Sequence, residues 1–278
     1  MGLRINTNIA ALTTSRILRN STLALNKSLE RLSSGLRINR AGDDAAGLAI
    51  AEGFRSVRQG SAVAQRNAQD GISFVQTAEG ALSEVVNMIQ RMRELAVQSA
   101  NGTNSVQNRD DLQLEVAQLL LQINATALNT EFNGVNPLNS ALPIILQVGH
   151  QSGQTLTIAG TVATPLALGL SGLVINGADL PTGQLNAQNA LATLDAALIV
   201  VNGQRSAFGA AQNRIEFTIK VLAIQEENSA AAESAIRDAD IAIETIIFTR
   251  NQILVSAGTS VLAQANLVPQ TALQLLGG

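Results

Sequence analysis

The chain has no cysteine, no tryptophan and no tyrosine, and phenylalanine occurs only 6 times in its 278 residues. Without cysteine it can form neither disulfides nor thiolate metal sites, and it has no cysteine nucleophile. Large aromatic side chains usually supply much of a globular core. Alanine, leucine, isoleucine and valine supply the apolar mass here, which favours long helices packed closely on one another over a compact globule.

Charge is also scarce, since charged residues make up 14% of the chain and the formal net charge is −3. This balance supports neither a nucleic-acid footprint nor a membrane-surface patch, and no stretch reaches the roughly 20 apolar residues of a membrane span. Only Lys27 and Lys220 are lysines, and the other basic residues are arginines, which suit interfacial hydrogen bonds. The many amide and hydroxyl side chains can be buried in an assembly without burying charge. The composition favours a polymer.

The sequence contains few residues that could form a catalytic site. His150 is the only histidine, so neither a Ser-His-Asp triad nor an H-E-x-x-H zinc site can be built around it, and we expect it to be an exposed turn residue. Acids cluster at Asp43–Asp44, at Asp110–Asp111 and at Asp238 with Asp240, each near a predicted helix start, where capping is favoured over a hydrolytic pair. No glycine-rich phosphate loop is followed by lysine. We expect no catalytic, cofactor or metal site, and therefore no enzyme.

Helical periodicity dominates the middle of the chain. The first pattern predicts one helix from about Asp44 to Gln98, roughly 80 Å long. A shorter helix should follow the turn cluster at 101–104, and another long helix should run near the C-terminal end. The residues that carry these three patterns are Val75, Leu82, Ile89 and Ala96; Leu112, Val116, Leu119 and Ile123; and Leu194, Val201, Phe208, Ile215 and Leu222.

The period changes between Phe132 and about Leu185. Apolar and polar residues alternate over 144–148 and 156–158, on either side of a turn-forming stretch at 150–153, which predicts a β-hairpin. One more short strand is predicted near Leu173–Ile175. The rest of this segment should form loops.

Both ends of the chain carry apolar residues at helical spacing. Leu25, Leu29, Leu32 and Leu36 alternate steps of four and three, and Ile247, Leu254, Val261 and Val268 recur every seven residues before Pro269, which should end the last helix. A single chain has only one helix at each end to cover the other, so these residues are our predicted assembly interface. We expect residues 1–40 and 235–278 to be disordered in the monomer and to become helical on assembly.

Several long stretches at both ends of the chain together carry a resemblance to one known family. At the N-terminal end these are LRINTN over 3–8, LERLSSGLRINRAGDDAAGLAI over 29–50, NAQDGIS over 67–73 and VQTAEGAL over 75–82. At the C-terminal end they are AGTSVLAQAN over 257–266 and VPQ over 268–270. These stretches resemble bacterial flagellin, the subunit of the flagellar filament, and the resemblance covers roughly residues 1–135 and 185–278.

The resemblance implies a mainly α fold, a long antiparallel helical rod or coiled coil with a small β-hairpin region. Residues 1–40 with 235–278 would form an inner coiled-coil layer, and residues 41–234 a rod domain that includes the hairpin region at about 133–185. Flagellins usually carry variable outer domains in the middle. The short middle segment here implies that these outer domains are absent.

The resemblance further implies a secreted, extracellular structural subunit that self-assembles into the helical flagellar filament for swimming motility. Its partners would be copies of itself, the flagellar export apparatus, an export chaperone that captures the C-terminal helix, and the filament cap and hook-junction proteins. Export through the flagellum's own channel accounts for a start, MGLRIN, without the apolar core of a secretory signal. The alternatives are a hook-filament junction protein, a flagellin with a peptidase in its middle segment and an unrelated coiled-coil scaffold.

A host receptor is a further implied partner. The stretch QRMRELAVQ over 90–98 resembles the segment by which some flagellins are detected by the flagellin-sensing Toll-like receptor, and Glu115 matches an acidic position on the returning helix. Arg91 and Leu95 are four residues apart, so they should share one helix face and present a cation beside an apolar side chain. The same face could instead pack against a neighbouring subunit.

Overall fold

The computed structural model describes the backbone of residues 7–276 and the side chains of residues 7–267. The described chain is mainly α-helical, as predicted, and none of its helices is both long and apolar enough to cross a membrane. Its elements in chain order are α1 (Ile9–Ser34), α2 (Ala45–Ala100), α3 (Val106–Asn129), β1 (Asn139–Ser140), β2 (Ile144–Gln147), β3 (Thr155–Ile158), β4 (Thr161–Val162), α4 (Leu180–Arg237) and α5 (Ile241–Leu276).

The chain divides into two compact units. The terminal unit contains Met1–Arg58 with Glu227–Gly278, and the central unit contains Gln59–Glu226. The division therefore falls inside α2 and α4, further from the chain ends than the predicted limits at residues 40 and 235. The boundary in the structure is defined by contacts between residues, whereas the predicted boundary is defined by breaks in the periodic sequence pattern.

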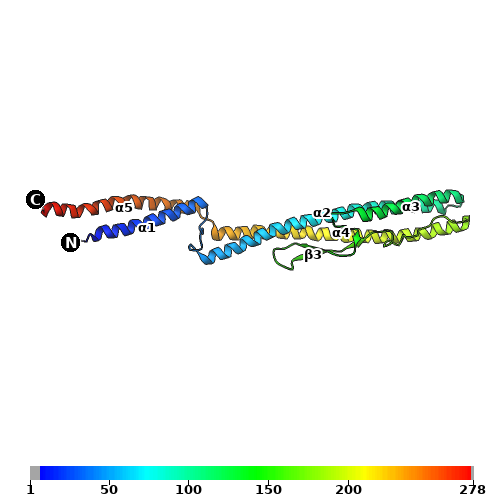
Figure 1. The fold of residues 1–278 in the computed structure, drawn as a ribbon, viewed down its shortest axis with the longest axis horizontal. Helices are drawn as coiled ribbons and strands as arrows, with labels where there is room; N and C mark the ends of the chain where they lie inside the picture. The colour runs from blue at the N-terminus through cyan, green and yellow to red at the C-terminus, as the bar shows by residue number, and fades with distance from the viewer. Residues whose placement is uncertain (1–6, 277–278) are drawn as a thin grey trace. The chain divides into compact units, whose positions relative to one another are not determined.

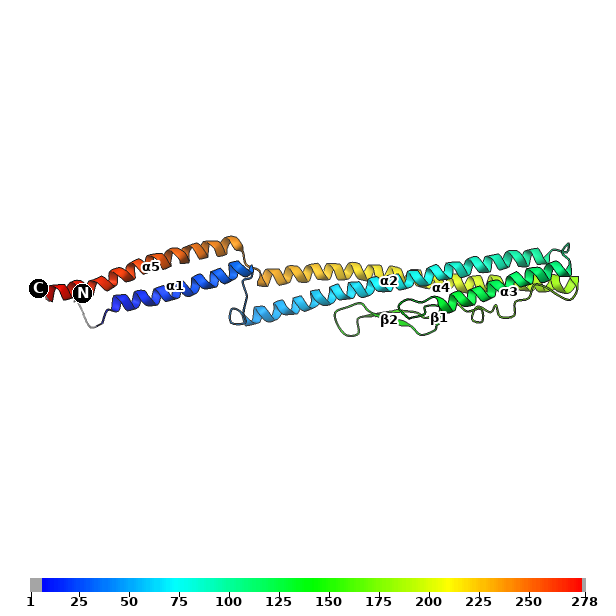
Figure 2. The same cartoon turned by 45° about the horizontal axis from the view of Figure 1, so that its top comes forward.

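In the terminal unit, α1 and α5 lie side by side and antiparallel (Figures 1 and 2). Asn8, ahead of α1, donates from Nδ2 to the Ala265 carbonyl near the far end of α5, at 2.7 Å. At the opposite end of the pair, Arg31 reaches Glu244 in the first turn of α5. In the structure α1 and α5 are thus helical and packed on each other within one chain, whereas the sequence analysis expects residues 1–40 and 235–278 to be disordered in the monomer.

The link between α1 and α2 is held by polar contacts. Gly35 ends α1 in the left-handed conformation, with φ of 71° and its N–H bonded to the Arg31 carbonyl. Leu36, predicted to continue the leucine pattern of the helix, therefore lies beyond its end and pairs with Asp238 in an isolated β-bridge. Because the glycine reverses the chain, a leucine spaced for the helix does not share its face.

The acid clusters behave mostly as predicted. Asp44 accepts the Gly47 N–H at 2.8 Å and caps α2, and Asp240 accepts the N–H groups of the first residues of α5 at 2.9 and 3.1 Å. Asp110 does not cap α3, which begins earlier at a Ser105 cap, and accepts instead from Asn176 Nδ2 at 2.7 Å. No described group of three or more acid or histidine side chains could hold a metal ion.

In the central unit, α2 and α4 run antiparallel and α3 packs along them (Figure 1). Polar pairs mark the antiparallel register: Gln65 with Glu226, Glu79 with Arg205, and Arg93 with Asp195. Between them lies one hydrophobic core, and the residues whose seven-residue recurrence predicts these helices are buried in it. Among these are Val75, Leu82, Ile89, Ala96, Leu194, Val201, Phe208 and Ile215.

Two small antiparallel strand pairs complete the central unit. The predicted hairpin is confirmed as β2 with β3, in which Ile144 faces Ile158 and Gln147 faces Thr155. It lies against α2 at two glycines, because Leu146 occupies the space that a side chain on Gly71 would need and His150 does the same at Gly60. His150 is thereby half-buried, not the exposed turn residue expected.

Two predicted details are wrong. Residues 173–175 form no strand, because the Gln113 side chain binds the Leu173 carbonyl and the Ile175 N–H and so replaces a partner strand, and the second strand pair is β1 with β4. Pro269 does not end the last helix, since α5 continues to Leu276. Proline removes one backbone hydrogen bond, and a long helix can continue past that loss.

Candidate assembly interface

The surfaces of α1 and α5 that face each other follow a heptad pattern that hydrophobicity alone does not reveal. The less exposed positions of α5 alternate steps of four and three, and those of α1 repeat every seven residues. We call this contact the inner seam. On α5 it consists of Glu244, Phe248, Asn251, Val255, Gly258, Leu262 and Ala265, and on α1 of Ala11, Thr14, Leu18, Ser21, Leu25, Ser28 and Leu32.

Small and polar side chains make up much of the inner seam, so the two helices approach closely. A Cβ atom at Gly258 would lie 3.3 Å from the Leu18 Cδ1 atom, at the limit of ordinary contact. Ser28 is 3% exposed and Asn251 is 8% exposed, yet neither contributes much apolar surface. The inner seam therefore provides little hydrophobic stabilisation for helices of this length.

An ion pair between Arg31, beside the inner seam, and Glu244, within it, joins α1 to α5. Arg31 Nη1 is 3.5 Å from Glu244 Oε2, and the side chains are 25% and 8% exposed. The Arg31 Nε and Glu244 Oε1 atoms are buried without a hydrogen-bond partner. Each charge thus depends mainly on the other, which favours one register of α1 on α5.

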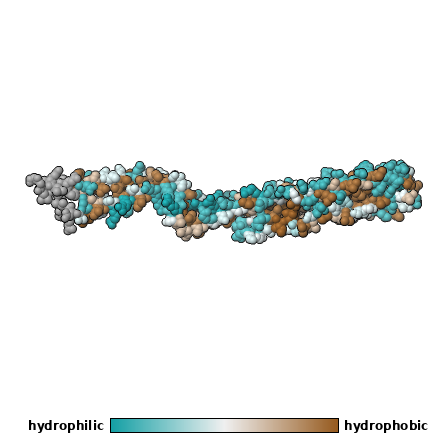
Figure 3. All heavy atoms as spheres, viewed as in Figure 1, coloured by the Kyte–Doolittle hydropathy of each residue, from teal (hydrophilic) through white to brown (hydrophobic). Residues whose placement is uncertain are grey.

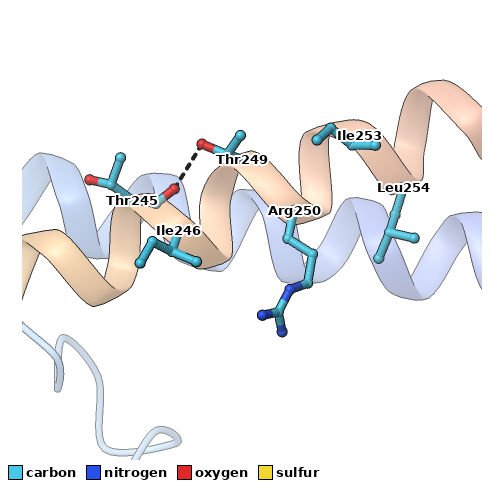
Figure 4. A pocket seen from close by; sticks show the side chains of 6 residues that line it. All are labelled: Thr245, Ile246, Thr249, Arg250, Ile253 and Leu254. Atoms are coloured by element: carbon cyan, nitrogen blue, oxygen red, sulfur yellow. Dashed lines mark hydrogen bonds between the residues drawn. The ribbon is translucent and has the colours of Figure 1, made fainter.

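Several other large apolar side chains of α5 point away from α1. Ile246 is 61% exposed, Ile253 62%, Leu254 48% and Val261 51%. Figure 4 shows part of this outer face, where Thr245, Ile246, Thr249, Arg250, Ile253 and Leu254 line a shallow, largely apolar depression. Figure 3 shows hydrophobic side chains at the surface of this unit and of the central unit. Soluble monomers rarely leave so much contiguous apolar surface open.

The predicted interface residues divide between the inner seam and the outer faces. Leu25 and Leu32 are half-buried in the inner seam, whereas Leu29 is 57% exposed on the outside of α1. On α5, Ile247 is half-buried beside the seam, and Leu254 and Val261 are exposed. The Val268 side chain lies outside the described residues.

The predicted receptor-facing residues are not all at the surface. Arg91 and Glu115 are exposed and paired, with 2.8 Å between Arg91 Nε and Glu115 Oε1, and Arg91 also reaches Glu94 Oε2 at 3.0 Å. The carboxylates of Glu115 and Glu94 raise the pKa of Arg91 above its usual value. Leu95 is only 2% exposed and belongs to the core. The prediction that Arg91 and Leu95 present a cation beside an apolar side chain is therefore wrong for this chain, because that turn of α2 packs inward.

Arg109 is a buried residue that sequence reasoning missed. It is 0% exposed and has no carboxylate partner among the residues whose side chains are described. Instead it donates to the carbonyls of Ser99, Leu180 and Asn101 at 2.9, 3.0 and 3.1 Å, and so joins the end of α2 to the beginnings of α3 and α4. Only its place after the turn at 101–104 hints at this in the sequence.

Comparison with known proteins gives concordant matches over both helical ends. The family model described as the bacterial flagellin N-terminal helical region matches residues 5–141, and that of the bacterial flagellin C-terminal helical region matches residues 191–276. The Treponema maltophilum flagellar filament 31.3 kDa core protein is 41% identical over 98% of this chain and 99% of its own. A flagellin of Halalkalibacterium halodurans is 47% identical over the same shares.

A solved structure agrees with these matches. The crystal structure of Bacillus cereus flagellin superposes with a TM-score of 0.50 at 33% identity, covering 60% of this chain and 94% of that one. The relatives are matched across nearly their full length, so the middle segment is as short in them as it is here. The helical ends, the hairpin-bearing central unit and these matches together show that this chain belongs to the bacterial flagellin family.

Proposed function

We propose that the chain is the structural subunit that self-assembles into the helical filament of a bacterial flagellum, which drives swimming motility. The observation that carries this proposal is the outward exposure of many large apolar side chains of α1 and α5, beside an inner seam in which large apolar residues alternate with small and polar ones. Neighbouring chains can bury that surface, and a single chain cannot. The members of this family are structural proteins. No specific observation favours a second function, and none favours the role of a hook-filament junction protein.

The same observation indicates which segments of the chain form which layer of the filament. Residues 1–40 and 235–278 form the inner layer of the filament, and residues 41–234 form the surrounding rod. The inner seam supports this arrangement because it aligns α1 with α5 and leaves their outer faces exposed for contact with other chains. Burial of those faces on assembly would offset the entropy cost of ordering the ends.

The test is polymerisation of variants at the outer face of α5. Leu254→Ser with Val261→Ser removes two exposed apolar side chains, and Gln252→Ser with Gln264→Ser is a matched control on exposed positions of the same helix. We expect the first pair to raise the critical concentration for filaments by about tenfold or more at unchanged helix content, and the control to leave it unchanged. Removal of residues 235–278 should leave a soluble, folded monomer. Filaments formed by that truncated chain would overturn the inner-layer assignment.

The same exposed apolar surface is a reason to propose partners that bind the chain before and after its export. We infer that the export apparatus secretes the chain to the extracellular filament, that an export chaperone covers α5 beforehand, and that cap and hook-junction proteins contact the growing filament. The exposed face of α5 would need such a cover while the chain is unassembled. Loss of chaperone co-purification in the Leu254→Ser, Val261→Ser chain would support this, and unchanged co-purification would contradict it.

Detection by the flagellin-sensing Toll-like receptor is supported only by the surface part of the predicted site. Arg91 and Glu115 form an exposed, charged pair, and buried Leu95 takes no part in it. The comparison is between Arg91→Ala and the wild type, as monomers in a receptor reporter assay and in polymerisation. Reduced signalling at normal helix content supports the receptor role. Loss of assembly with unchanged signalling leaves Arg91 a packing role alone.

A further inference from the structure

The outer face of α3 carries a row of leucines that nothing in the described chain covers. Leu114, Leu121 and Leu128 recur every seven residues and are 66%, 63% and 46% exposed. Gln118 and Ala125 lie between them at alternating steps of four and three. This spacing places all five on one face of the helix, the pattern by which one helix packs against another. We call these five residues the leucine row.

A second apolar face runs along the outside of α4. Ile199, Phe217, Val221 and Ile224 are 73%, 66%, 62% and 59% exposed, and they fall on one side of the helix. Between Ile199 and Phe217 the same side carries the small residues Gly203, Ser206 and Ala210. The large side chains therefore lie at the two ends of a shallow stretch in which no side chain projects far from the helix. A Cβ atom placed on Gly203 would meet no atom within 4 Å, so that stretch is open. We call this surface the α4 saddle.

The charges beside these two faces are opposite in sign. Asp111 flanks the leucine row, and its one side-chain contact among the described residues is a long hydrogen bond from Gln107, at 3.5 Å. Glu115 lies on the same side of the helix and is paired with Arg91 of its own chain. The α4 saddle is flanked by Arg214 on one side and Lys220 on the other, and neither makes an ion pair with a described residue. The Lys220 ammonium instead lies over the Phe217 ring, 5.3 Å from its centre. The Asp111 carboxylate beside one face and the two cations beside the other are thus without ion-pair partners among the described residues.

We propose that the leucine row of one chain packs into the α4 saddle of a neighbouring chain. Leucine side chains can fill the shallow stretch at Gly203, Ser206 and Ala210, and Arg214 and Lys220 then meet the acids beside the leucine row. Pairing the leucine row with itself would place Asp111 and Glu115 against their own copies. Because the two faces differ, each chain keeps one of each free, and such a contact propagates into a helical polymer. The proposal rests on the self-assembly proposed above and names the surfaces of the central unit that take part.

The absence of cysteine makes a cross-linking test clean. Single-cysteine chains are prepared at Leu114, Leu121 or Leu128 and, separately, at Ile199, Phe217 or Ile224, and are mixed in pairs, polymerised and treated with a short bis-maleimide. Ser152→Cys, in the exposed turn of the hairpin, serves as the control partner. We expect mixed dimers between the two sets, at about ten times the yield of the control pairs, in filaments and not in monomers. Filaments that give no mixed dimers, or only leucine-row dimers, overturn the proposal while leaving self-assembly intact.

A charge exchange tests the same contact independently. Arg214→Glu with Lys220→Glu should raise the critical concentration about tenfold, and adding Asp111→Lys to that chain should recover part of the loss. Recovery is not expected when Glu131→Lys is added instead, since Glu131 is an exposed acid that lies after the end of α3. An unchanged critical concentration in the first variant, or equal recovery by both additions, contradicts the pairing. Failure of the wild type to polymerise would instead remove the proposed function itself.

Discussion

Arg109 shows how a charge can be buried without a counter-charge. Two of its three carbonyl acceptors, Ser99 and Asn101, lie at the C-terminal end of α2, where the helix dipole leaves partial negative charge, and the third, Leu180, is the first residue of α4. The planar guanidinium donates to them from three separate nitrogens, Nε, Nη1 and Nη2, whereas a lysine ammonium carries all its donors on one nitrogen. Gly183 leaves room for it, since a Cβ atom there would lie 3.0 Å from Arg109 Cδ.

Replacement of Arg109 by lysine should therefore be costly. We expect Arg109→Lys to lower the free energy of unfolding by about 2–3 kcal/mol, because at least one buried carbonyl is left unpaired. Urea unfolding of the monomer measures this. Arg93→Lys is the control, since the Arg93–Asp195 pair is about half exposed and should contribute less than about 1 kcal/mol. An equal decrease in the free energy of unfolding in the two variants would show that the three hydrogen bonds of the buried Arg109 guanidinium have no special role.

The Arg31–Glu244 pair makes a different prediction for the inner seam. Arg31→Met leaves the Glu244 carboxylate buried without its partner, and we expect a loss of about 2 kcal/mol in the terminal unit, less than for a fully buried pair because Arg31 is 25% exposed. Hydrogen exchange of α1 and α5 amides reports it. The double variant Arg31→Met, Glu244→Leu should regain most of the protection. Protection that stays low in the double variant would mean that the ion pair itself, and not relief of a lone charge, holds the helices together.

At the level of helices and strands, the link between α1 and α2 depends on one carboxylate. Asp43 binds Lys27 at 2.7 Å and accepts the N–H groups of Arg40 and Asn39. These contacts, that from Lys27 first, lower the pKa of Asp43 from 3.8 to about 2. Since the ionised form is favoured in the folded chain, its stabilisation is present above pH 3.8 and is lost as the pH falls through about 2.

The corresponding prediction concerns the acid range. In the wild type, protection of the 36–44 amides against hydrogen exchange should decline as the pH is lowered from about 4 to about 2. In Asp43→Asn the protection should already be low at neutral pH and should change little over that range. A wild-type profile without a step there, or a similar step in Asp43→Asn, would assign the acid sensitivity to another group.

The sequence predicted the elements that depend on apolar periodicity, namely the long helices, the returning helix and the hairpin. It did not predict the inner seam, because Ser21, Ser28 and Asn251 repeat at heptad spacing without being apolar. It also placed Leu95 on the surface, since four-residue spacing from Arg91 does not say which turn of a long helix is covered by a neighbour. Backbone reversal at Gly35 and side-chain bonding by Gln113 were likewise invisible to periodicity.

For the whole molecule, the middle segment should face solvent once the filament forms. Residues 140–185 contain the turn at Gly153 and the loop at Gly177, whereas Leu95 lies in the core. Limited proteolysis of intact filaments should cut near Gly153 or Gly177. Protection of both sites together with cutting near Leu95 would require the opposite orientation of the chain in the filament.

The pairing of distant segments also fixes the order in which the chain can fold. Asn8 and Ala265 are 257 positions apart, and Arg237 and Glu52 are 185 positions apart. While the chain is being synthesised, α1 and α2 therefore have to wait for α5 and α4, and such non-local contacts close slowly. A nascent chain with this topology stays open until its C-terminal helices emerge. That open state is the one in which a polypeptide can be threaded through a passage narrower than its folded width.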